Sequence, residues 1–267
     1  MKLCFSTLGC PDWRWNDIVA AAVDLGYNGI EVRGVGSELF VPRIMQLREE
    51  HREHTLKRLA GVSLQIPILT SGCELQRGEI IDETIFQIKE YIDLASAIGT
   101  PYIRVLGDTD PAPSDSVDEG LVKDAAQLLG AYAHEKGATL LIETNGWFAD
   151  TGRLAKLLES INSPAVAALW DLNHPYRYNG ESVDDVINDL GDSIRHVHIK
   201  DSVMQDGRLV YRVTGQGDLP IAECVEKLGA RGFDGFFSLE WVRRWNMSLE
   251  EPGIAFALYS QYMRSIG

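Results

Sequence analysis

The sequence predicts a single-domain (β/α)8 barrel, the TIM-barrel architecture, spanning residues 1–267. Strand-like and helix-like segments alternate eight times without a linker-like break, and such alternation implies a parallel sheet. The length of 267 residues is close to the roughly 250 that are typical of one such barrel. Four of the predicted strands also end in an acid or a histidine. An open doubly wound sheet is the alternative, but it would not explain functional residues at the ends of strands five to eight.

Apolar runs and helical spacing mark the elements of the first half. Trp15, Ile18, Val19 and Ala22, for example, recur at helical spacing, and a glycine follows each helix. The predicted strands cover residues 2–7, 29–32, 62–68 and 102–106, and the predicted helices cover residues 15–25, 46–59, 79–98 and 118–136.

The second half repeats the alternation with shorter helices. The stretch 201–218 is long and polar, and it accounts for the extra residues before the last strand. The predicted strands cover residues 139–144, 166–172, 194–200 and 235–240, and the predicted helices cover residues 151–160, 182–190, 220–228 and 252–265.

Composition limits the class of protein. With 45% hydrophobic and 24% charged residues, the chain can build a large core. A net charge of −14 argues against a nucleic-acid partner, which usually meets a basic face. No apolar run approaches the roughly 20 residues of a membrane span. The four cysteines form no close pair, which suggests a reducing compartment, so we expect a cytoplasmic protein without a membrane partner.

The stretch 194–200 places His196, His198 and Lys200 on one face of a strand, because side chains alternate along it. Taken alone, such histidines are as readily structural residues as metal ligands. Three other strand-like runs, however, end in an acid: Glu143, Asp171 and Glu240. Asp171 follows Glu143 by 28 positions and precedes His198 by 27, about one βα unit each. In a barrel these four side chains converge at the C-terminal mouth, as a mixed oxygen and nitrogen set for one divalent metal ion.

Five motifs together resemble the xylose isomerase-like TIM-barrel superfamily, most closely its sugar phosphate isomerase/epimerase branch. They are Ile-Glu-Thr-Asn at 142–145, Trp-Asp-Leu-Asn-His at 170–174, His-Val-His-Ile-Lys-Asp at 196–201, Thr-Gly-Gln-Gly at 214–217 and Leu-Glu-Trp at 239–241. The branch includes ketose 3-epimerases, hydroxypyruvate isomerases, inosose-handling enzymes and dehydroshikimate dehydratases.

The resemblance implies a ligand set and a substrate site. One divalent ion (Mn, Mg, Co or Zn) would be held by Glu143, Asp171, His198 and Glu240, with His196 packed in the core. The histidine of the family's D-x-x-H motif, which touches substrate oxygens, falls on His174, although a helix-cap neighbour before Pro175 is the other interpretation. The arginine that precedes G-x-G in ketose epimerases falls on Arg212, although a solvated loop arginine is the other interpretation.

Two expectations concern charged groups near the mouth. Glu31 also ends a strand, and we expect it in a structural ion pair with Arg33 or Lys2. Lys200 and Arg212 are the only obvious cations near the mouth, which favours an unphosphorylated keto-sugar or polyol as substrate.

The ligand set suggests a mechanism. Chelation of a carbonyl and the adjacent hydroxyl would stabilise an enediolate as a proton leaves the neighbouring carbon. Glu143 and Glu240, from strands on different sides of the mouth, are the candidate acid–base pair, as the resemblance also implies. The expected activity is therefore that of a metal-dependent isomerase or epimerase of a small carbohydrate. Relatives commonly form dimers or tetramers, so a homo-oligomer is open.

Three alternatives remain. The same four ligands permit dehydration, as in inosose or dehydroshikimate dehydratases, and the sequence does not distinguish dehydration from isomerisation or epimerisation. A DNA-repair endonuclease of the superfamily uses three metals and more ligands. This chain has only six histidines, of which His51, His54 and His134 fall in predicted helices. A non-catalytic sugar-binding barrel is disfavoured by the presence of all four ligands.

Overall fold

The computed structural model describes residues 1–267 and divides into two compact units. Unit 1 comprises Met1–Pro67 and His196–Gly267, and unit 2 comprises Ile68–Arg195. Eight strands pair in parallel, four associated with each unit. Not one helix combines the length and the apolar character needed to cross a bilayer.

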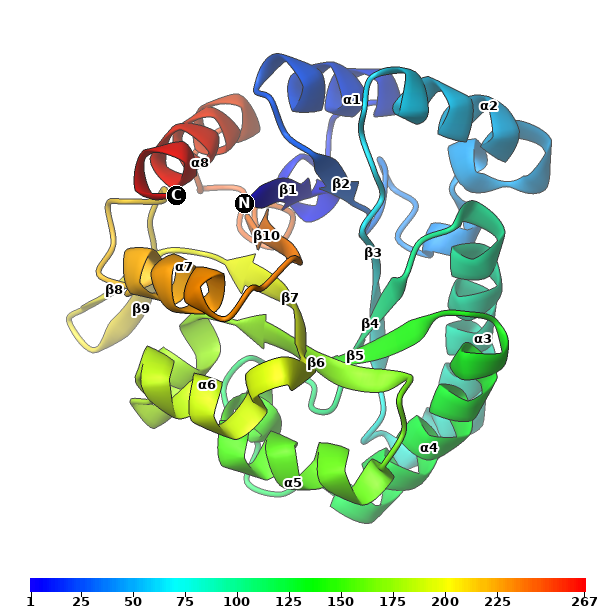
Figure 1. The fold of residues 1–267 in the computed structure, drawn as a ribbon, viewed down its shortest axis with the longest axis vertical. Coiled ribbons are helices and arrows are strands. Elements are labelled where there is room, and N and C mark those ends of the chain that lie inside the picture. Colours follow the sequence, from blue (N-terminus) through cyan, green and yellow to red (C-terminus); the bar gives the residue numbers. More distant parts are fainter. The chain divides into compact units, whose positions relative to one another are not determined.

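The strands of unit 1 run in the order β2-β1-β10-β7, with helices on one face (Figure 1). The register places Ser238 of β10 beside His198 of β7, so both strands end at the same edge. The strands are β1 (Lys2–Ser6), β2 (Gly29–Glu31), β7 (Ile194–Ile199) and β10 (Phe236–Leu239); the helices are α1 (Trp15–Asp24), α2 (Glu49–Gly61), α7 (Ile221–Ala230) and α8 (Pro252–Ile266).

Unit 2 repeats the pattern with the order β3-β4-β5-β6, again with helices on one face (Figure 1). All six residues of β6 are buried, as expected for a parallel strand covered on both faces. The strands are β3 (Ile68–Glu74), β4 (Tyr102–Leu106), β5 (Thr139–Glu143) and β6 (Val166–Asp171); the helices are α3 (Ile81–Ile98), α4 (Glu119–Glu135), α5 (Thr151–Ile161) and α6 (Val183–Leu190).

Local capping explains where several helices begin and end. Asp118 accepts a hydrogen bond from the backbone N–H of Leu121 at the start of α4, and Ser182 forms a capping box with Asp185 at the start of α6. Gly99 ends α3 in the left-handed conformation at φ 71°. These side chains satisfy backbone groups that the helices leave without partners.

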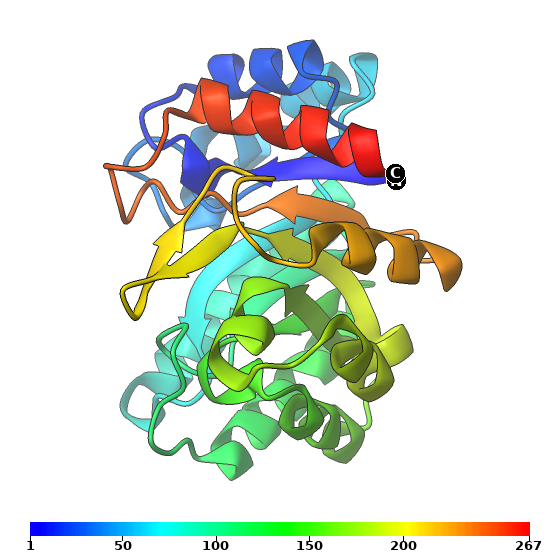
Figure 2. The same ribbon diagram turned by 90° about the vertical axis from the view of Figure 1, so that its left-hand side faces the viewer.

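One prediction of local structure is wrong, and one stretch without a predicted element contains a hairpin. The third strand was expected at 62–68, but β3 begins at Ile68, because α2 continues to Gly61 and Ser63 turns the chain at φ 57°. The polar stretch 201–218 contains an antiparallel hairpin of β8 (Ser202–Gln205) and β9 (Arg208–Tyr211), drawn in yellow in Figure 2. Its turn places Asp206 and Gly207 at positive φ, which suits a two-residue hairpin loop.

Candidate metal centre

Glu143 ends β5 in unit 2 and is buried beside an arginine. Its Oε2 lies 2.7 Å from Nε of Arg104, and both side chains are less than 10% exposed. Arg104 also donates through Nη1 to the backbone oxygen of Ser71 at 2.6 Å. The arginine comes from β4, whose sequence is otherwise apolar. A cation within an apolar strand is the sequence signal for a buried partner, and here that partner is Glu143.

Asp171 ends β6 and is held by the chain that follows it. Its Oδ1 accepts hydrogen bonds from the backbone N–H groups of Asn173 at 2.8 Å and His174 at 3.2 Å. The hydroxyl of Thr144 accepts from the backbone N–H of Asp171 at 2.8 Å. The carboxylate is therefore oriented by backbone groups within three residues of it.

His174 is buried, and its tautomer follows from its contacts. Nδ1 lies 2.9 Å from the backbone oxygen of Thr144, which can only accept, so Nδ1 carries the hydrogen. In the neutral ring Nε2 is then an acceptor, and it lies 3.8 Å from Oδ1 of Asp171. The structure thus brings His174 next to one predicted metal ligand.

His198, on β7 in unit 1, shares a carboxylate with His196. Nε2 of His196 lies 3.1 Å from Oε2 of Glu31, and Nε2 of His198 lies 3.0 Å from the same oxygen. All three side chains are fully buried. Burial raises the pKa of Glu31, but the two imidazoles outweigh this and hold it well below its usual range. The partners of Glu31 are thus two histidines, and Lys2, one of its two expected partners, pairs with Asp234 instead.

The contact with Glu31 fixes the tautomer of His198. An ionised carboxylate only accepts hydrogen bonds, so Nε2 of His198 must donate. The neutral ring then keeps its lone pair on Nδ1, which lies 3.5 Å from Oε1 of Glu240. A metal-binding histidine is commonly oriented in this way, through a carboxylate on its other nitrogen. Sequence reasoning missed this role of Glu31, because the contact spans 167 positions.

Glu240 follows β10 and is 4% exposed. Its Oε2 forms a short contact with Nζ of the buried Lys200. Each unit thus buries two strand-end carboxylates, and in each unit one of them contacts a buried cation: Glu143 contacts Arg104, and Glu240 contacts Lys200. Buried carboxylates need compensating charge, and this surplus favours an additional cation.

The Thr-Gly-Gln-Gly motif is held by Asp201. Oδ2 of Asp201 accepts from the backbone N–H groups of Gly215 and Gly217, both at 2.9 Å. A Cβ atom at Gly217 would clash with Asp201, so this close approach requires glycine. Arg212, by contrast, is only half-buried at the end of the hairpin, and its Nη2 donates to Oε1 of Gln205 at 3.0 Å.

A family model described as xylose isomerase-like TIM barrel matches residues 19–258 of this chain. The chain belongs to this family. The predicted (β/α)8 fold and the resemblance are therefore confirmed. Fructoselysine 3-epimerase of Shigella flexneri is 25% identical over 253 residues, covering 86% of this chain and 85% of the relative.

Two solved structures show the same fold. The probable 3-DHS dehydratase AsbF of Bacillus anthracis has a TM-score of 0.81 at 20% identity, with 99% of both chains covered. A xylose isomerase-like TIM-barrel protein of Mycobacterium smegmatis, in complex with magnesium, has a TM-score of 0.76 at 15% identity, with 99% of this chain and 96% of that chain covered. At these identities the likeness concerns the fold alone.

Proposed function

We propose that the protein is a divalent-metal-dependent isomerase or epimerase of a small keto-sugar or polyol. Glu143, Asp171, His198 and Glu240 would hold the ion. The observation that carries the proposal is that all four strand-end side chains are buried and that they supply three carboxylates and one imidazole, which are donor types of divalent-metal sites. The similarity to a 3-epimerase over most of both chains supports the reaction class.

The donor set fits such an ion. Three carboxylates suit hard cations such as magnesium and manganese, and the imidazole also suits zinc and cobalt. His198 contributes Nδ1, because Glu31 engages Nε2. When bound, a divalent ion supplies positive charge that stabilises the oxygen made negative as a substrate proton leaves.

The protein's own groups move the proton. Glu143 and Glu240 would act as base and acid at the carbon beside the carbonyl, one removing the proton and the other returning it. Arg104 and Lys200 each contact Oε2 of one of these glutamates and so fix its orientation. His174 presents Nε2 as an acceptor for a substrate hydroxyl, and Arg212 would bind substrate from the hairpin.

A dehydratase is the second candidate. Its first step is the same proton abstraction, after which a β-hydroxyl leaves. The similarity to an inosose dehydratase and to a 3-dehydroshikimate dehydratase favours this alternative. A conjugated product that absorbs in the ultraviolet would identify it.

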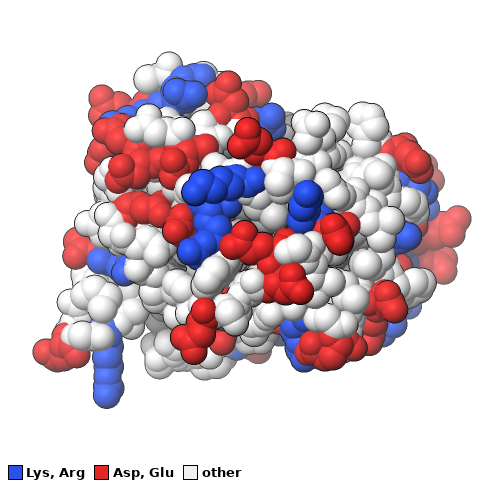
Figure 3. Space-filling model, turned by 90° about the horizontal axis from the view of Figure 1, so that it is seen from below, with Lys and Arg blue, Asp and Glu red and all other residues white.

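An endonuclease is disfavoured because His51 and His54 lie on α2 and His134 on α4. On the face in Figure 3, acidic and basic side chains are interspersed.

Metal analysis tests the proposal. The purified protein should contain about one divalent ion per chain, and the His198→Ala variant should lose it. His134→Ala is the matched control, because His134 is exposed on α4. Loaded protein would then be assayed on ketoses, inososes and hydroxypyruvate. A protein that takes up neither manganese nor zinc contradicts the proposal, and three ions per chain would favour the endonuclease.

A further inference from the structure

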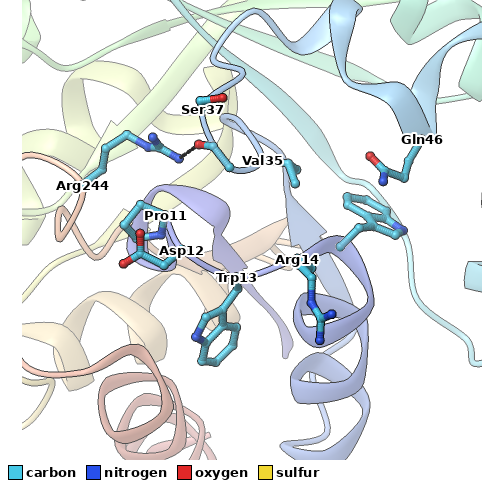
Figure 4. Close-up of a pocket in the computed structure, with 10 residues that line it drawn as sticks. Pro11, Asp12, Trp13, Arg14, Val35, Ser37, Gln46 and Arg244 are labelled. Carbon is cyan, nitrogen blue, oxygen red and sulfur yellow. Dashed lines mark hydrogen bonds between the residues drawn. The ribbon is translucent and has the colours of Figure 1, made fainter.

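Unit 1 contains a cavity of about 550 Å³, whose lining residues are drawn in Figure 4. Its walls come from segments that follow the C-terminal ends of β1, β2 and β10. In a barrel of this family these βα loops form the substrate-facing end. The residues that matter below are Asp12, Trp13, Arg14, Trp15 and Arg244.

Arg244 lies in the cavity wall, and one of its N–H groups has no hydrogen-bond partner. Its Nη2 donates to the backbone oxygen of Gly36 at 2.8 Å, the dashed contact in Figure 4. Its Nε is buried and has no hydrogen-bond partner. Burial lowers the pKa of Arg244, and the charges of Cys10 and Asp12 offset this only in part. A partly desolvated guanidinium is thus left without an ion pair.

Two arginines close to Arg244, by contrast, have carboxylate partners. Arg14 lines the same cavity, but it is exposed and already paired with Asp17 through Nε at 3.0 Å. Arg243, the neighbour of Arg244, pairs with Glu251 at 2.6 Å. The sequence indicated only Lys200 and Arg212 as cations near the mouth. Arg244 is a further cation after the C-terminal end of a strand.

We propose that this cavity binds the anionic end, a carboxylate or a phosphate, of an extended sugar substrate, with Arg244 as the specificity-determining residue. The inference rests on the proposed function, because the sugar end would react near Glu240. A guanidinium meets either anion with two parallel donors. Trp13 and Trp15 supply apolar walls for the connecting chain. The exposed Asp12 would meet an ammonium group, which favours an amino-acid-conjugated sugar over a sugar phosphate.

Calorimetric titration of the metal-loaded protein tests this with three probes: fructoselysine, fructose 6-phosphate and fructose. We expect at least one charged sugar to bind about tenfold or more tightly than fructose, as suits a hydrogen-bonded charge pair. The two charged probes identify which anion is preferred. Arg244→Gln should bring the ratio of affinities close to one. Arg264→Gln is the matched control and should keep the ratio, because Arg264 also donates to a glycine carbonyl, that of Gly26, but from α8.

Equal binding of all three probes by the unaltered protein would overturn the inference, as would an unchanged ratio in Arg244→Gln. If that variant does not fold, Arg244→Lys should lower the ratio while keeping the charge. Metal content separates the two proposals. A protein that holds its metal but ignores the charged sugars contradicts only this inference. A protein that prefers the charged sugars without holding any metal contradicts only the proposed function.

Discussion

The strand ends of the two units orient their chemical groups in different ways. In unit 2, Asp171 is held by backbone N–H groups two and three residues further along the chain. In unit 1, His198 is held by Glu31, which is 167 positions away. The first arrangement forms whenever the local turn forms, whereas the second requires β1 and β10 to assemble correctly between β2 and β7. Substitutions in the surroundings of the two ligands should therefore differ in their effects.

The largest effect should come from the two proposed acid–base residues, one in each unit. Glu143→Gln and Glu240→Gln should each lower turnover by about 10²- to 10⁴-fold, because an amide cannot accept or return the proton. Glu135→Gln and Glu226→Gln, at exposed positions of unit 2 and unit 1, should keep full turnover. If either active-site variant turned over at the normal rate, that glutamate would not be a catalytic residue.

The next effect tests the long-range arrangement directly. Glu31→Gln should lower metal affinity by about 10- to 100-fold, because a neutral carboxamide lacks the negative charge that holds the two imidazole N–H groups on one oxygen. Thr144→Val, which removes a local hydroxyl contact of Asp171, should cost less than tenfold. Metal titration measures both affinities.

Nitrogen NMR of the metal-free protein reads the tautomer of His198, which we expect to carry its hydrogen on Nε2. A hydrogen on Nδ1 instead would remove the reason for assigning an orienting role to Glu31.

A smaller effect, on the free energy of unfolding, is expected from a substitution of Asp201 in unit 1. Asp201→Asn replaces an acceptor oxygen by an amide donor that faces backbone N–H groups, so it should lower the free energy of unfolding by about 3 kcal/mol. Asp206→Asn, in the hairpin turn at positive φ, should be close to neutral because asparagine tolerates that conformation. Urea denaturation compares the two, and equal losses would show that the Asp201 contacts contribute little.

The same contrast explains what the sequence could and could not reveal. Strand-end position and spacing singled out Glu143, Asp171, His198 and Glu240, because that signal lies within each βα unit. The partners Glu31 and Arg244 were misjudged or missed, since their contacts depend on which distant segments meet. The third strand was misplaced because its apolar run begins before Pro67, and backbone turns rather than hydrophobicity decide where pairing begins.

The smallest expected effect concerns a half-buried carboxyl group in unit 2. The Thr151 hydroxyl lies 2.6 Å from Oε2 of Glu181 and 2.8 Å from Oδ2 of Asp189. A hydroxyl has one hydrogen, so both contacts are hydrogen bonds only when one carboxyl group carries a proton. Burial raises the pKa of Glu181, and the charges of Asp150 and Asp189 raise it further, while hydrogen bonds from Thr151 lower it in part.

Because the pKa of Glu181 is raised on folding, its contribution to stability is fully present below its unfolded pKa of about 4.3 and is lost as the pH rises through the folded value. The side chain of the Glu181→Gln variant cannot ionise. Between roughly pH 5 and pH 8 the variant should therefore lose less stability than the unaltered protein. Half-exposure limits the difference to below about 1 kcal/mol. Denaturation at several pH values measures it. Parallel pH profiles would contradict a raised pKa of Glu181.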